Sequence, residues 1–588
     1  MKKLIEWISE EVAKAFKKAG YDSYYGRITV SNRPDLCEYQ CNGAIAAQKA
    51  YQKASFLIAE DVAEVMDSSE VCEKVTVMKP GFINIKVSKQ FLVEYLQQMY
   101  KDARLSSDLS SDPKSIIVDY GGPNVAKPLH VGHLRSAIIG ESLKRIGRFL
   151  GHRIIGDVHL GDWGLQMGLI IIELKERKPE LVYFDESFAG EYPLESPFTI
   201  SELEEIYLAA SIKSKKDEDY RERALVATRE LQENRRGYMA LWNHIMTISV
   251  NDLKKTYKKL NVEFDLWKKE SDAQPYIPEM IQRMKEGGYA YEDQGALVVD
   301  VKKETDVNEI PPCIVLKSDG ASLYTTTDLA TLIARIKQFH PDEILYVVDK
   351  RQELHFIQIF RCAWKTGLVK PDTKLSFLGF GTMNGKDGKP FKTREGGVMR
   401  LENLIRDIDQ TMYRKIMKNK NVKDTDAEKI AEMVGLSAIK YGDLSHQISR
   451  DYVFDIERFT SFEGNTGPYI LYTIVRIKSI LTRYVKEGGS LQENILMPAT
   501  SDSEKGLMLK TARFNSVVDN AFEEKAPHKV CFYIYELSND FNCFYHKTKI
   551  LTEENSEQKA SWILLLDLVR RVLEECIELL GFSAPERM

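Results

Sequence analysis

The chain has 588 residues, of which 43% are hydrophobic and 29% charged, and its formal net charge is -5. This length predicts several domains, and the composition is typical of globular proteins. Apolar runs such as "LIIIEL" (169–174) are much shorter than the roughly 20 residues of a membrane span, so we expect no membrane segment. The negative charge argues against indiscriminate nucleic-acid binding but allows a partner at a local basic surface.

The eight cysteines show no repeated pair spacing, which argues against a zinc site and against a disulfide framework. We therefore expect a reduced, cytoplasmic protein. Two basic stretches, 254–259 and 414–423, fit either a solvated helix face or a surface for an acidic partner.

Residues 1–110 are predicted to form a small α+β module. Leu4, Ile8, Val12 and Phe16 lie on one helical face that ends before Gly20, and the glutamates between them argue against a signal sequence. Further on, the alternating apolar residues of "GFINIKV" (81–87) predict a half-buried strand.

A polar stretch at 106–115 marks the start of a second domain, predicted at 115–400. It opens with the strand "IIVDYGG", a loop, a helix from about 132 to 150 and a strand at 153–158, which together form a βαβ unit. Further apolar strands at 313–317, 343–349 and 375–381 indicate that the sheet resumes after a charged insertion at about 175–295. The pattern predicts a doubly wound, Rossmann-like α/β domain with a parallel sheet.

The remaining residues, 401–588, are predicted to form connecting helices and an all-α bundle. Ile470, Ile474, Ile477 and Leu481 follow the spacing of one helix face. A last helix at about 562–580 is expected to stop near Gly581.

The stretch "PNVAKPLHVGHLRSAIIG" (123–140) is the main candidate functional motif. It follows the first strand of the sheet, where ligands bind in open α/β folds, so His130 and His133 are expected to face a crevice. Free N–H groups at the start of the following helix favour phosphate, and Gly132 would let an adenine approach the backbone. Two alternatives remain: a metal-binding histidine pair and two structural core histidines. No HExxH spacing or P-loop accompanies the motif.

"HVGH" looks like the HIGH signature of class I aminoacyl-tRNA synthetases, and the longer string "PNVAKPLHVGHLRS" resembles arginyl-tRNA synthetases in particular. The resemblance covers almost the whole chain. It includes, in the expected order, "HLGDWGLQ" (159–166), "NVEFD" and "ES" (261–271), "LYTTTDLA" (323–330), "RQELHFIQ" (351–358), "FEGNTGPYILY" (462–472) and the terminal "FSAPERM".

The resemblance implies a ligase that joins L-arginine to tRNA(Arg) in two steps. The arginine carboxylate attacks the α-phosphate of ATP, and the arginyl group then moves to the terminal ribose of the tRNA. Magnesium would accompany the ATP, held by phosphates and water, so no protein metal site is expected. His130, His133 and Lys127 are the candidates for stabilising the phosphate charge in the transition state.

The plain KMSKS motif of class I enzymes is absent, and "GTMNGKDGKPFKTREGG" (381–397) stands in its place. Its "FKTR" resembles the degenerate version of arginyl enzymes, in which Lys389, Lys392 and Arg394 would clamp the phosphates, with Lys392 contacting ATP. An exposed glycine-rich hairpin is the alternative. Which lysine replaces the missing one stays open, and Lys127 is a substitute by charge.

The arginine pocket is expected to hold carboxylates, because a guanidinium needs planar acidic partners. Asp328 and Glu270 fall in the strings that would supply them, and Tyr324 lies one helical turn before Asp328. Asn124 and Gln358 match positions expected to hold the amino-acid backbone or side chain. The alternatives are helix capping for Asp328 and a surface position for Glu270. No editing domain is expected, because such a pocket rejects other amino acids strongly.

Two other functions are possible: a class I synthetase or nucleotidyl transferase for another substrate, and a noncatalytic RNA-binding relative. The first gives Asp328 and Glu270 no role, and the second does not need the histidines of the motif, which are present. The resemblance further implies that residues 455–588 bind the anticodon region, that the N-terminal module contacts the tRNA elsewhere, and that tRNA must bind before arginine is activated. We expect a monomer.

Overall fold

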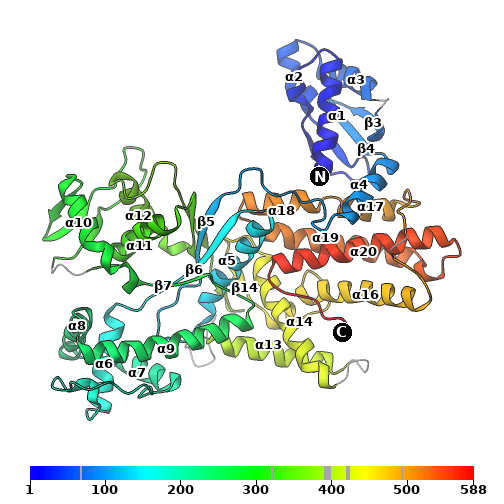
Figure 1. Ribbon diagram of the computed structural model, residues 1–588. Coiled ribbons are helices and arrows are strands. Elements are labelled where there is room, and N and C mark those ends of the chain that lie inside the picture. The colour runs from blue at the N-terminus through cyan, green and yellow to red at the C-terminus, as the bar shows by residue number, and fades with distance from the viewer. Residues whose placement is uncertain (67–68, 319–321, 390–398, 419–423, 492–493) are drawn as a thin grey trace.

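The structure is a computed structural model that describes residues 1–588 except 67–68, 319–321, 390–398, 419–423 and 492–493. Figure 1 shows an N-terminal module that projects beside the C-terminal helices, a central sheet, and a lobe of helices on the far side of that sheet.

The N-terminal module is α+β, as predicted. Its four-stranded antiparallel sheet has the order β1-β2-β4-β3. Leu4, Ile8, Val12 and Phe16 are buried, which confirms the amphipathic first helix. The elements are α1 (Leu4–Lys18), β1 (Ile28–Val30), β2 (Tyr39–Cys41), α2 (Gly43–Tyr51), α3 (Ser55–Met66), β3 (Cys72–Met78), β4 (Phe82–Val87) and α4 (Lys89–Lys101).

A five-stranded parallel sheet with the order β12-β11-β5-β6-β7 forms the centre of the molecule. The chain first builds outward from β5 through β6 to β7, and then returns to the other side of β5 with β11 and β12. The carboxyl end of β5 is therefore the point where the strand order reverses, which is where such sheets bind ligands. The strands are β5 (Ser115–Tyr120), β6 (Arg153–Leu160), β7 (Leu266–Lys269), β11 (Glu343–Asp349) and β12 (Lys374–Phe380).

Two strands differ from the sequence-based expectation. The strand at 313–317, β10 (Cys313–Leu316), was expected in the parallel sheet but pairs antiparallel with β9 (Ala296–Val299), which pairs in turn with β8 (Ala290–Asp293). A short apolar run is the same for both kinds of strand, so composition cannot separate them. Conversely, β7 belongs to the parallel sheet, although it falls within the stretch 175–295 that the sequence pattern predicts to be an insertion.

A buried ion cluster joins the middle of the sheet to the helix that covers it. Nη2 of Arg335, on α11 (Tyr324–Phe339), lies 2.5 Å from Oδ2 of Asp119 and 2.7 Å from Oδ2 of Asp157. Burial raises the pKa of Asp119 even though Arg335 opposes this shift. The guanidinium thus holds two buried carboxyls of neighbouring strands, β5 and β6, together.

Helices cover the sheet and fill the rest of the chain. The helix α5 (Val131–Phe149) connects β5 to β6 and confirms the predicted βαβ unit. The stretch between β6 and β7 forms α6 (Leu165–Arg177), α7 (Ile200–Lys213), α8 (Glu218–Gln232) and α9 (Arg236–Lys259), the lower left lobe of Figure 1. The helices α10 (Ile277–Glu286) and α12 (Glu353–Lys365) lie with α11 in the upper left lobe.

The C-terminal part is helical, as predicted. Ile470, Ile474, Ile477 and Leu481 are buried on α16, and Gly581 follows the last helix with a φ of 84°. A short parallel pair, β13 (Met383–Asn384) with β14 (Tyr452–Val453), joins this part to the sheet domain. The helices are α13 (Leu401–Ile416), α14 (Asp424–Leu444), α15 (Ile456–Phe459), α16 (Gly467–Lys486), α17 (Asp502–Thr511), α18 (Phe514–Glu523), α19 (His528–Lys547) and α20 (Ser556–Leu579).

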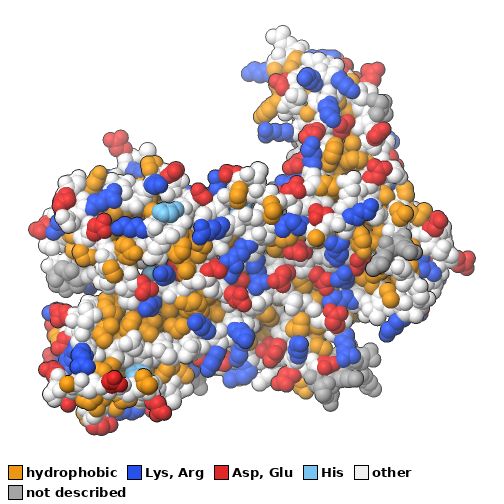
Figure 2. Space-filling view, in the orientation of Figure 1, with side chains coloured by type: hydrophobic (Ala, Val, Ile, Leu, Met, Phe, Trp, Pro, Cys, Tyr) orange, Lys and Arg blue, Asp and Glu red, His pale blue; other side chains and the backbone are white. Residues whose placement is uncertain are grey.

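The surface mixes charges of both signs. Figure 2 shows Lys and Arg side chains interspersed with Asp and Glu over the visible face. None of the helices in the described ranges has the length and apolar character needed to cross a membrane.

Candidate active site

The two histidines of the motif lie at the start of α5, beyond the carboxyl end of β5. His130 is the N-cap residue, and its Nδ1 accepts a hydrogen bond from the backbone N–H of Gly132 at 3.0 Å. The backbone N–H of His130 donates in turn to Nδ1 of His133 at 3.2 Å. The two rings lie against each other with their centroids 3.9 Å apart. A helix-capping arrangement therefore fixes both rings at a helix N-terminus.

This arrangement determines the protonation of both rings. Burial, with a contribution from the Lys127 ammonium, lowers the pKa of His130. Burial, reinforced by His130 and Lys127, lowers the pKa of His133 to about 3. Both rings are therefore neutral at pH 7, and because each Nδ1 accepts a hydrogen bond, the ring proton lies on Nε2. Each histidine offers one neutral N–H donor.

The alternatives for the histidines find little support in the geometry. Within the described residues, no three His, Cys, Asp or Glu side chains are arranged to hold a metal ion. Neither histidine is fully buried, so they are not core residues.

The segment expected to replace KMSKS is anchored at both ends on the first turns of α5. Nη1 of the buried Arg135 donates to the carbonyl of Gly381 at 2.7 Å. At the other end, the backbone N–H of Val131 donates to the carbonyl of Met399 at 3.1 Å, and Leu401 N–H donates to Leu129 O at 2.8 Å. Both ends of the segment therefore lie beside the two histidines.

Of the three cations expected in this segment, only Lys389 lies in the described part, and its side chain is exposed. Lys392 and Arg394 lie outside the described residues. Lys127, the proposed substitute, places Nζ 4.8 Å from the ring centroid of Tyr207 on α7. Its charge reaches both histidines, as their pKa shifts indicate.

Asn124 lies against the loop that follows β6. It forms an isolated parallel bridge with Gly161, and the N–H of Val125 donates to Gly161 O at 3.0 Å. A Cβ at position 161 would lie 2.0 Å from Oδ1 of Asn124, so a side chain there would displace the amide. The backbone contacts place Asn124 at the same sheet edge as the histidines.

Carboxyl groups gather after β6 and β7, at the same edge of the sheet. Glu270 follows β7 directly, and burial together with the charges of Asp162 and Asp328 raises its pKa to about 8. Asp162 is completely buried and accepts hydrogen bonds from Ser271 N–H (3.0 Å) and from Ser271 Oγ (2.6 Å). The charges of Asp162 and Asp328 reach Glu270, and such a group of carboxyls favours a cationic ligand.

Asp328 does not cap its helix, because α11 begins at Tyr324 and its N-cap is Leu323. Its Oδ2 instead lies 2.7 Å from Nε2 of His355 on α12. Tyr324 is 65% exposed at the first position of α11, one turn before Asp328.

Gln358 has a different environment from the one expected. Its Nε2 donates to the carbonyls of Pro311 (2.9 Å) and Pro312 (3.2 Å), so this amide holds the loop before β10. Nothing in the sequence singles out Asp162 or His355. Both lie in quoted strings, "HLGDWGLQ" and "RQELHFIQ", but only their tertiary contacts set them apart from other polar residues there.

Comparison with known proteins assigns the part of the chain that carries this site to a catalytic domain. The model for the catalytic domain of "tRNA synthetases class I (R)" matches residues 95–456, which include every described residue of the site. The chain belongs to the arginyl-tRNA synthetase family. The models for the "Arginyl tRNA synthetase N terminal domain" and the "DALR anticodon binding domain" match residues 2–87 and 470–588 of this synthetase.

Its curated relatives are similar over their full lengths. An "Arginine--tRNA ligase" of Agathobacter rectalis is 62% identical and one of Alkaliphilus oremlandii 58%, each with 100% of both chains covered. Among solved structures, the arginyl-tRNA synthetase of Plasmodium falciparum has a TM-score of 0.82 at 26% identity, with both chains fully covered. That of Thermus thermophilus has a TM-score of 0.79 at 21% identity, over 99% of this chain and 100% of the other, which shows the shared fold.

The first prediction concerns His133. If its Nε2–H stabilises phosphate charge chiefly in the transition state, His133→Ala should lower turnover by about 100-fold or more and leave the KM for ATP nearly unchanged. Steady-state kinetics, with a melting curve for each protein, check this. Wild-type turnover, or a loss that unfolded protein fully explains, would contradict a catalytic role for His133.

The second prediction concerns Asp328. Asp328→Asn keeps the shape of the side chain but removes the charge that a guanidinium needs, so the KM for arginine should rise by about 10-fold or more. Asp306→Asn is a matched control, since it removes a carboxylate charge from a pair with Arg361 outside the pocket. Equal losses for arginine and ATP would point to a structural role for Asp328 between α11 and α12.

Proposed function

We infer that this protein is an arginine–tRNA ligase, which activates L-arginine with ATP and transfers the arginyl group to the 3′ end of tRNA(Arg). The inference depends above all on one observation: neutral histidine donors at a helix N-terminus and a carboxyl cluster lie at the same edge of the parallel sheet. The first arrangement suits phosphate and the second suits a guanidinium.

On the phosphate side, we assign no protein nucleophile. The Nε2–H groups of His130 and His133 would donate to phosphate oxygens as pyrophosphate leaves, and Gly132 leaves the backbone accessible to the nucleotide. Lys127 and Lys389 would add positive charge, together with Lys392 and Arg394, which the structure does not describe. Such positioned donors are each typically worth about 100- to 1000-fold in rate.

On the arginine side, Glu270 and Asp328 would bind the guanidinium, with Tyr324 beside them and Asn124 holding the rest of the amino acid. Gln358 would contribute only through Oε1, because its Nε2 donates to the carbonyls of Pro311 and Pro312. The raised pKa of Glu270, about 8, means that this carboxyl is protonated at pH 7 as long as no cation lies beside it. A bound guanidinium would favour the carboxylate and release the proton. An amino acid without this charge would leave Glu270 without a cationic partner, and mismatches of this kind are penalised by roughly four to five orders of magnitude in comparable polar pockets, so no editing domain is needed.

The tRNA would contact both ends of the chain. We assign the anticodon region to residues 455–588, where the exposed faces of α16 and α19 carry Tyr, Arg and Lys side chains that can stack on bases and grip phosphates. The N-terminal module would touch the tRNA elsewhere. Arginine activation would depend on bound tRNA, as the family resemblance implies.

Magnesium would enter with ATP. We assign it no protein ligand, since no carboxyl cluster able to hold a metal occurs in the part of the chain that the structure describes. We further propose that the ligase works as a monomer in the cytoplasm.

The third prediction tests the function as a whole. Total tRNA is incubated with ATP and each of the twenty amino acids, and pyrophosphate exchange with arginine is measured with and without tRNA. We expect charging with arginine alone and exchange that requires tRNA. Charging with another amino acid would contradict the assignment, whereas robust exchange without tRNA would contradict only the dependence on tRNA.

A further inference from the structure

Two helix C-termini from distant parts of the chain meet at one buried lysine. Past the end of α9, Asn261 has a φ of 50°, and past the end of α20, Gly581 has a φ of 84°. Nζ of Lys440, on α14, donates to the carbonyls of Asn261 (3.0 Å) and Gly581 (2.9 Å). Nδ2 of Asn261 also donates to Gly581 O at 3.0 Å. We call these three residues the Lys440 junction.

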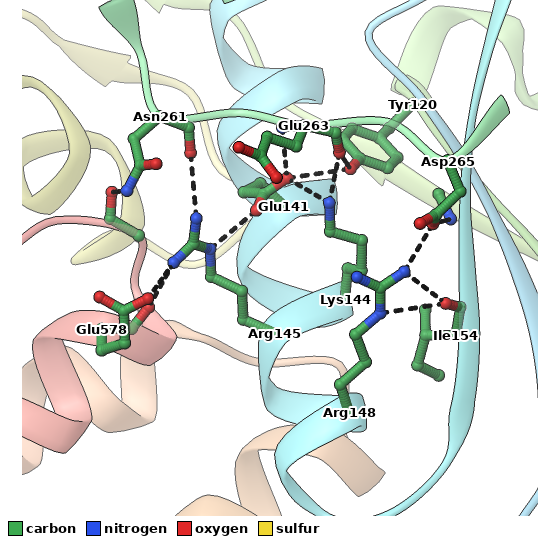
Figure 3. Close-up of polar contacts among 12 residues, drawn as sticks. Tyr120, Glu141, Lys144, Arg145, Arg148, Ile154, Asn261, Glu263, Asp265 and Glu578 are labelled. Carbon is green, nitrogen blue, oxygen red and sulfur yellow. Dashed lines mark hydrogen bonds and ion pairs between the residues drawn. The ribbon is translucent and has the colours of Figure 1, made fainter. Parts of the chain in front are cut away.

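The junction is joined to the helix that carries the active-site histidines. On α5, Oγ of Ser142 donates to the carbonyl of Leu579 at 3.1 Å. The guanidinium of Arg145 donates to the carbonyls of Asn261 (3.4 Å) and Glu578 (3.3 Å), and it pairs with the Glu578 carboxylate. Figure 3 shows Arg145 between Asn261 and Glu578, on the side of α5 that faces the end of α20.

Asn261 of the junction is also the first residue of the segment that leads to the proposed arginine pocket. Residues 261–265 run directly into β7, and β7 ends at Lys269, one residue before Glu270. Glu263 N–H donates to Oε2 of Glu141 (3.1 Å), and its carbonyl accepts from the hydroxyl of Tyr120 (2.8 Å). At the end of the segment, Asp265 accepts from Gly156 N–H at 2.7 Å. Figure 3 shows these contacts on both sides of the segment, so its position follows from its neighbours.

Lys440 makes the positions of the two helix ends depend on each other. Its side chain is completely buried, and none of the ion pairs found among the described residues joins its ammonium to a carboxylate. Burial lowers the pKa of Lys440 to about 7, although Glu141 opposes this shift. The ammonium therefore depends on two carbonyls from different helix ends. If either helix end moves, a buried donor loses its acceptor, which is costly.

We propose that Asn261 and Lys440 are positioning residues for arginine binding: they hold the segment that carries Glu270 against the end of α20, so that the C-terminal helices set the affinity for arginine. The proposal rests on the role given to Glu270 under Proposed function. It names a physical route by which anything bound to the C-terminal helices can act on the arginine pocket.

The test compares Asn261→Gly with a matched control, Asn234→Gly. Both asparagines have positive φ, 50° and 64°, which glycine adopts more easily, so neither change strains the backbone. Asn261→Gly removes the amide contact to Gly581, whereas Asn234, after α8, is exposed and away from the junction. KM and kcat for arginine and ATP are measured in aminoacylation at saturating tRNA, together with the melting temperature.

We expect Asn261→Gly and Lys440→Met to raise the KM for arginine about fivefold or more, with the KM for ATP and the control variant unchanged within twofold. In the double variant Asn261→Gly/Glu270→Gln, the Asn261 change should add little to the effect of Glu270→Gln, because it acts through Glu270. Should Lys440→Met fail to fold, Asn261→Gly alone decides.

An unchanged arginine KM in Asn261→Gly, an equal rise for ATP, or additive effects in the double variant would each overturn the proposal. A wild-type arginine KM in Glu270→Gln would instead overturn the pocket assignment under Proposed function. The two failures are therefore distinguishable.

Discussion

The carboxylate of Glu141 lies inside the protein between two cations of its own helix, with Lys144 Nζ at 2.8 Å and Arg145 Nε at 2.7 Å (Figure 3). Burial opposes the charge, but the two cations hold the pKa of Glu141 below its ordinary value. The same carboxylate accepts hydrogen bonds from the hydroxyl of Tyr120 (3.0 Å) and from the N–H of Glu263 (3.1 Å), so it holds α5 against β5 and against the segment before β7. Removing one partner from such a buried group is strongly destabilising. Since His130 and His133 begin the same helix, the cluster also fixes the phosphate side of the active site.

The two halves of the site use opposite electrostatics at one sheet edge. On the side that we assign to phosphate, each neutral imidazole offers one N–H donor, and Lys127 adds positive charge. On the side that we assign to arginine, burial together with the charges of Asp162 and Asp328 raises the pKa of Glu270 to about 8, an environment that favours a cation. Arg335 contributes to both halves by holding Asp119 and Asp157 together at the centre of the sheet. A substrate that carries a carboxylate at one end and a guanidinium at the other fits this division.

The spacing of apolar residues in the sequence predicted those elements of the fold in which that spacing is regular. The first helix, the βαβ unit around the motif and the helices of the C-terminal part follow from apolar spacing and helix-end residues. The pairing of β10 did not, because four apolar residues read the same in a parallel and in an antiparallel sheet. The position of β7 was likewise hidden, since "LWKK" carries charge and lies among charged helices.

In the candidate site, too, the sequence predicted features set by neighbouring residues but not those set by contacts between distant segments. The motif predicted His130 and His133 correctly at a helix N-terminus, because capping is a local property. The partner of Asp328 at His355 and the burial of Asp162, in contrast, depend on residues far apart in the chain. No pattern within one segment carries that information. Gln358 shows the converse, since its amide is occupied by a neighbouring loop that the sequence could not place.

The central claim is that a carboxyl pocket selects the guanidinium of arginine by charge. Calorimetric binding of arginine and of citrulline, its neutral isostere, to the tRNA-saturated protein at pH 7 tests it most directly, in two buffers of different ionisation enthalpy. The account predicts that arginine binds about 100-fold more tightly or better and releases about one proton, because the Glu270 carboxyl ionises on binding. Equal affinities for the two ligands, without proton release, would contradict it.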